Sequence, residues 1–159
     1  MEKRYEQDLQ KWNSTPTEKK TKRNKPVKVE FGVRICQKDC KYYVGEVGTS
    51  GGHREVSPLS VPPCDDGDKM IGYAHSHPDK NASLSDNDRK IAKEGFGSNF
   101  NIDENIKIPP KIIMTASVRD GEGNIRTHLY NPNKPAGKTN ATFINGIRPV
   151  SYTHLTLPT

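Results

Sequence analysis

The chain is 159 residues long, carries a formal net charge of +6, and is only 31% hydrophobic, with a mean hydropathy of −0.89. This length allows one domain with a modest core, and because no apolar run is long enough to cross a bilayer, we expect no membrane span. Residues 1–28 hold nine Lys or Arg against four acidic residues, a net of +5 that leaves +1 for the rest, and such a run is typical of a solvated arm rather than of a nucleic-acid surface.

The N-terminal segment predicts a helix followed by a linker. Tyr5, Leu9 and Trp12 recur at helical spacing with charged residues between them, which indicates an amphipathic helix over residues 2–13 that can pack on a sheet. The polar and basic residues that follow form a linker up to Pro26. The N-terminus is polar and lacks the apolar core of a signal peptide.

Residues 27–36 alternate between two kinds of side chain, which predicts a strand with one buried face. One set is apolar and the other is polar or small: Val27, Val29, Phe31, Val33 and Ile35 against Lys28, Glu30, Gly32 and Arg34. We expect the apolar set to be buried, which puts Glu30 on the opposite, exposed face unless that face lines a cleft. A turn at 37–39 and a second strand at 41–47 complete a hairpin.

The chain has three cysteines, Cys36, Cys40 and Cys64. Their odd number and wide spacing fit neither a disulfide framework nor a zinc knuckle. Cys36 and Cys40 flank the predicted turn, so a cross-strand disulfide between them is one alternative. The other alternative, which we expect, is that the cysteines are reduced thiols.

The remaining segments predict an α/β domain in which helices flank a mixed sheet. In chain order, we expect a loop at 48–69, a strand at 70–75, a helix from Ser85 to Glu94 that stops at Gly95, a loop at 96–110, a strand at 111–118, a turn at 120–124 and a strand at 125–130. Residues 1–26 are the N-terminal helix and basic linker, and the folded domain spans 27–132. A polar tail follows at 133–149.

The last ten residues read VSYTHLTLPT and look like a translated sequencing-library adapter. A reading frame that ran from a natural insert into adapter DNA would end in this way. We therefore leave residues 150–159, including His154, out of the expected fold and site.

The segment HSHPDKNASLSDND, residues 75–88, predicts a metal site. His75 and His77 are two apart on a strand, so their imidazoles point to the same face. Asp88, from the following helix, can complete a set of two nitrogens and one oxygen, and catalytic zinc uses three protein ligands with the fourth position left to water. Ser85 and Asp88 also match a helix-capping pattern, and capping alone is the alternative explanation for these two residues.

These four residues carry a family resemblance. His-x-His, seven residues, Ser, two residues and Asp resembles the signature of the JAB/MPN (JAMM) metalloproteases, and the chain is most similar to the JAB-like C-terminal domains of bacterial polymorphic toxins. The resemblance implies a cytidine-deaminase-like JAB/MPN architecture, Zn²⁺ held by His75, His77 and Asp88, and Ser85 as a donor to the oxyanion. It also implies an upstream catalytic glutamate. Glu30, in VKVEFGVRIC, is our choice, with Glu46 and Glu55 as alternatives.

The resemblance implies a zinc peptidase that cuts a peptide or isopeptide bond in a protein or peptide substrate. A toxin domain of this kind would also have an immunity protein as a partner, and it would be either cytoplasmic or delivered within a secreted toxin. One alternative is a housekeeping peptidase that acts on a ubiquitin-like tag or on cell-wall or phage-tail peptides. Another is a non-catalytic MPN-like interaction domain.

Overall fold

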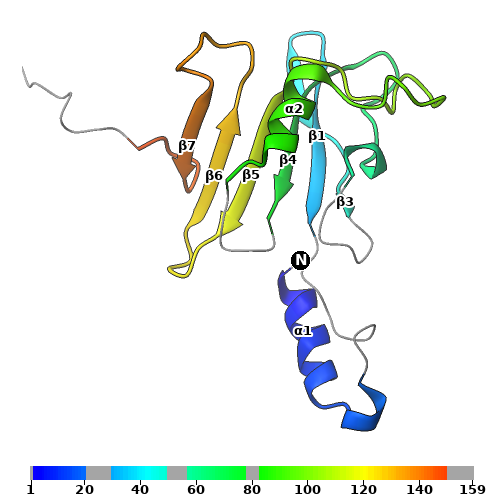
Figure 1. Cartoon of the computed structure of the whole chain (residues 1–159), viewed down its shortest axis with the longest axis vertical. Helices are drawn as coiled ribbons and strands as arrows, with labels where there is room; N and C mark the ends of the chain where they lie inside the picture. The colour runs from blue at the N-terminus through cyan, green and yellow to red at the C-terminus, as the bar shows by residue number, and fades with distance from the viewer. Residues whose placement is uncertain (1, 21–29, 50–56, 78–82, 150–159) are drawn as a thin grey trace, which may run out of the picture.

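The computed structural model describes residues 2–20, 30–49, 57–77 and 83–149, and within them it shows the expected mixed α/β architecture. A seven-stranded sheet has the order β2-β1-β4-β5-β6-β7, with β3 paired to β1, and only β4 and β5 run parallel among these pairs (Figure 1). The elements are α1 (Glu2–Asn13), a 3-10 turn (Thr17–Lys19), β1 (Phe31–Lys38), β2 (Lys41–Val44), β3 (Gly48–Thr49), a 3-10 turn (Pro58–Ser60), β4 (Lys69–Ser76), α2 (Asp86–Glu94), β5 (Ile113–Arg119), β6 (Ile125–Tyr130) and β7 (Asn140–Ile144).

The buried face of β1 is the reverse of the one predicted. Gly32, Arg34 and Cys36 are buried, whereas the alternating apolar residues, such as Val33 and Ile35, remain partly exposed. The alternation separated the two faces correctly, but it did not say which face the rest of the chain would cover. The covered face is the one on which α2 and the loops pack. Glu30 precedes the strand on this side, and residues 27–29 of the predicted strand lie outside the described residues.

The core lies between α2 and this face of the sheet. Strands β4 and β5 contribute Tyr73, Met114 and Ala116, and α2 contributes Ile91 and Ala92. An irregularity in the β1–β4 pairing, between Ile35 and Cys36, adds one residue to β4, so that Met70 and Tyr73 are both buried although they are three apart. Figure 1 shows α2 crossing in front of β4 and β5.

Two terminal segments differ from prediction. α1 covers the predicted residues, but Figure 1 shows it beyond the ends of the strands rather than on a face of the sheet. β7 lies within the predicted polar tail and pairs antiparallel with β6, so the sheet extends to Ile144, past the predicted domain end at residue 132. Residues 150–159 lie outside the described part of the chain. Within the described residues, no helix is long and apolar enough to cross a membrane.

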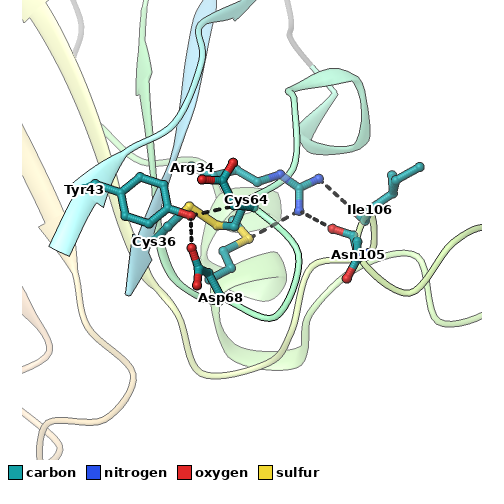
Figure 2. Close-up of a disulfide and its surroundings, with 9 residues drawn as sticks. Arg34, Cys36, Tyr43, Cys64, Asp68, Asn105 and Ile106 are labelled. Atoms are coloured by element: carbon teal, nitrogen blue, oxygen red, sulfur yellow. Dashed lines mark hydrogen bonds between the residues drawn. A yellow bond between two sulfur atoms is a disulfide. The ribbon is translucent and has the colours of Figure 1, made fainter. Parts of the chain in front are cut away.

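A disulfide joins Cys36 to Cys64, so the expectation of reduced thiols was wrong for these two residues, as was the alternative pairing of Cys36 with Cys40. Cys36 points to the covered face of β1, where the segment after the Pro58–Ser60 turn passes over it. Cys40 is free and exposed at the hairpin turn. Figure 2 shows Arg34 beside the disulfide, where its guanidinium donates hydrogen bonds to backbone carbonyls, including that of Ile106 at 2.6 Å.

Candidate metal centre

The two histidines stand at the end of β4, as predicted. His75 is the last residue but one of the strand and is 6% exposed, and His77 follows the strand directly. The His77 backbone N–H donates to the Ser117 carbonyl at 2.9 Å, which extends the parallel pairing with β5 by one step. Ser76, between them, points to the other face, where its Oγ accepts a hydrogen bond from the Phe31 N–H. The pleat therefore turns both imidazoles toward α2.

The first turn of α2 brings the carboxylate to the histidines. Ser85 is the N-cap, and it forms a capping box with Asp88: Ser85 Oγ accepts from the Asp88 N–H, and Asp88 Oδ2 accepts from the Ser85 N–H, both at 3.1 Å. The same Oδ2 lies 3.4 Å from His75 Nε2 and 4.0 Å from His77 Nε2. Capping and convergence on the histidines are therefore compatible, because the box fixes the rotamer that aims Asp88 at them.

The three donor atoms lie close to the spacing that one metal ion requires. The two Nε2 atoms are 3.1 Å apart, and all three donors lie within 4.8 Å of one another. Ligands about 2.0–2.1 Å from one tetrahedral zinc ion are roughly 3.3 Å apart, so only Asp88 would need to move closer to His77. The His75 Nδ1 is buried with no hydrogen-bond partner among the described residues, which leaves Nε2 as the atom that reaches the cluster. His75, His77 and Asp88 can therefore hold a metal ion.

The electrostatics of the cluster favour an ionised carboxylate. Burial tends to raise the pKa of Asp88, but hydrogen bonding and charge interaction with His75, together with the hydrogen bonds from Ser85, outweigh burial and lower it. Asp88 is thus ready to act as an anionic ligand at neutral pH. Tyr73 stacks on His75, with ring centroids 5.4 Å apart.

The structure distinguishes two of the three candidate glutamates, Glu30 and Glu46. Gly32 pairs with His75, and continuing this antiparallel register by two residues sets Glu30 opposite His77, on the same face. Glu46 is exposed and lines a different hollow, between β2 and the segment around Pro62. Glu55 lies outside the described residues. Among the glutamates that can be compared, Glu30 is the one on the face of the ligand cluster.

Two features of this face were missed by the sequence analysis. Tyr73 lies directly beneath His75, and Gly32 gives its hydroxyl room, because a β-carbon at Gly32 would overlap the Tyr73 Oη. Counting back by two from His75 would have placed Tyr73 on the site face. His128 is on β6, two strands away from His75. It pairs with Ala116 of β5, which in turn pairs with His75, and it does not belong to the donor cluster.

Comparison with known proteins adds no relative. No family model, curated protein or solved structure matches this chain. The functional argument therefore rests on the motif and on the geometry of the ligand cluster.

Proposed function

We propose that this chain is a zinc-dependent peptidase of the JAMM type, most similar to the JAB-like domains of bacterial toxins, which hydrolyses a peptide or isopeptide bond. The observation that carries the proposal is the convergence of His75 Nε2, His77 Nε2 and Asp88 Oδ2, from two elements, at metal-ligand spacing. Two imidazoles with one carboxylate favour zinc over magnesium or calcium, which prefer oxygen ligands. The parallel β4–β5 pair with α2 packed over it is consistent with a JAB/MPN architecture.

The chain's own residues can supply the remaining chemistry. When bound, zinc supplies a Lewis acid that acidifies water and polarises the scissile carbonyl. Glu30 accepts the proton of the attacking water and passes it to the leaving amine. Ser85 uses an oxygen lone pair to cap α2, so its hydroxyl proton remains available to stabilise the oxyanion, and loss of such a donor typically costs about 10²–10³-fold in rate.

The first experiment measures metal content and hydrolysis together. We expect about one zinc per chain by elemental analysis. His77→Ala should lose both the metal and the activity in a screen of fluorogenic peptides and isopeptide-linked ubiquitin-like proteins. His128→Ala is the matched control, because this histidine lies outside the cluster, and it should keep the metal.

A second variant separates binding from catalysis. Glu30→Gln should keep the zinc and lose turnover, because the amide cannot accept a proton. Unchanged turnover in this variant would move the role to Glu46 or Glu55. Folded protein, verified by circular dichroism, that takes up no zinc after reconstitution would refute the peptidase and favour the non-catalytic interaction domain.

A further inference from the structure

The hydroxyl of Tyr73 is a buried polar group beside the ligand cluster that the mechanism above does not use. The Tyr73 side chain is 2% exposed, and its ring is inclined by only 25° to that of His75. Its Oη has no hydrogen-bond partner in the part of the chain that the structure describes. An unpaired buried hydroxyl destabilises a fold, so phenylalanine would serve a pure packing role better.

Two observations place this hydroxyl next to Glu30. The overlap that a β-carbon on Gly32 would create shows that Oη lies against the β1 backbone at this glycine. Glu30 lies one residue before β1 begins and two residues from Gly32, so continuing the pleat of β1 puts its side chain on the same face.

The other polar neighbours do not suit the Tyr73 hydroxyl as acceptors. Arg34 is its cross-strand partner, but a guanidinium has only donors, and the terminal nitrogens of Arg34 already bond to carbonyls such as those of Pro58 and Ile106. Asp88 is held toward Ser85 and the histidines through its Oδ2, and it forms no hydrogen bond with the Tyr73 hydroxyl. Glu30, which directly precedes β1, is the remaining carboxylate on this face among the described residues, and the hydroxyl forms no hydrogen bond with it in this structure.

We propose that Tyr73 is a positioning residue whose hydroxyl, unpaired among the described residues of this structure, donates a hydrogen bond to the Glu30 carboxylate once that side chain turns toward the ligand cluster, and holds it there. This inference rests on the proposed function, in which Glu30 carries the proton. The Glu30 side chain, beside the start of β1, can adopt several rotamers. A misplacement of its carboxylate by about 1 Å can cost roughly 10²-fold in rate. Gly32 belongs to the same arrangement, because only a residue without a side chain admits the hydroxyl there.

A double-mutant cycle on the full-length, zinc-loaded chain tests the pair without a substrate. The urea midpoints of wild type, Tyr73→Phe, Glu30→Ala and the double variant are compared, with zinc content measured for each. Tyr73→Phe should lower the midpoint when Glu30 is present, because it removes a hydrogen bond. When residue 30 is alanine, the same change should leave the midpoint unchanged or raise it. Equal shifts in the two backgrounds would overturn the proposal.

Controls and kinetics complete the test. Tyr43→Phe, which removes a hydroxyl bonded to Asp68 at 2.5 Å, should lower the midpoint equally in both backgrounds. On any substrate that the wild type cleaves, Tyr73→Phe should lower kcat about 10- to 100-fold and leave KM unchanged. The cycle can also be run in chelator. If the two substitutions are coupled but the protein hydrolyses no substrate, the proposed peptidase function is refuted and the Tyr73–Glu30 hydrogen bond is supported. If the protein hydrolyses a substrate but the two substitutions are not coupled, only the Tyr73–Glu30 hydrogen bond is refuted.

Discussion

Replacing Cys36 and Cys64 together by alanine should lower the free energy of unfolding by about 3–4 kcal/mol. The disulfide joins residues separated by 28 positions, so it restricts a loop of this size in the unfolded chain. The loop-entropy relation gives about −12 cal/mol/K for such a loop, or about 3.6 kcal/mol at 25 °C. Cys36 is fully buried, and alanine preserves its small apolar character, so the change should come mainly from the lost cross-link.

Urea unfolding followed by circular dichroism measures this loss. With a typical slope of about 1–3 kcal/mol per molar urea, the midpoint should fall by roughly 2 M, and a reductant should have the same effect on the wild type. Cys40→Ala is the control, because Cys40 is free and exposed, and its midpoint should not change. Identical midpoints with and without reductant, or peptide mapping that finds Cys36 bonded to Cys40, would refute the reasoning.

Three further predictions concern α2 and its ends. Ser85→Ala should lower the free energy of unfolding by about 1 kcal/mol in urea titrations, because it removes the N-cap of α2. Gly95→Ala should cost more than about 1 kcal/mol in the same assay, since Gly95 has φ of +80° and its new β-carbon would lie 2.5 Å from the Ile108 carbonyl oxygen, whereas Gly121→Ala, with open space around it, should cost little. In the metal-free protein, the lowered pKa of Asp88 contributes stability above the unfolded pKa of about 3.8 and loses it as the pH falls through the folded pKa. Asp88→Asn should therefore flatten the acid end of the stability profile in urea titrations, and an unchanged slope there would contradict this assignment.

Local signals explain why the ligand cluster could be predicted from sequence. The period of two places His75 and His77 on one face whatever surrounds the strand. The capping pattern fixes the start of α2 at Ser85 and orients Asp88 within its first turn. Each signal spans only a few residues, and the structure confirms that the donors of these residues meet. The zinc and the chemistry remain predictions.

Features that depend on distant segments could not be predicted in this way. Arg34 was assigned to an exposed face, yet it is 1% exposed because carbonyls from the Pro58 and Ile106 segments surround its guanidinium. The partner of Cys36 likewise comes from a loop that packs over β1. β7 was missed because a short strand at the edge of a sheet has no strong apolar pattern of its own. In each case the deciding contact joins segments remote in sequence.

The register of β1 against β4 connects the stability of the fold to the proposed chemistry. At one end of this pair, Gly32 lies opposite His75, and near the other end Cys36 lies opposite Met70. A slip of one residue would turn Glu30 away from the histidines, because the side-chain period is two. The disulfide anchors the end of β1 that is remote from the metal cluster, so it can hold this register without contacting the site. A reduced protein that stays folded should therefore keep its metal ligands, because β4 and α2 supply them. Any loss of turnover in the reduced protein would come from displacement of Glu30 when the register of β1 changes.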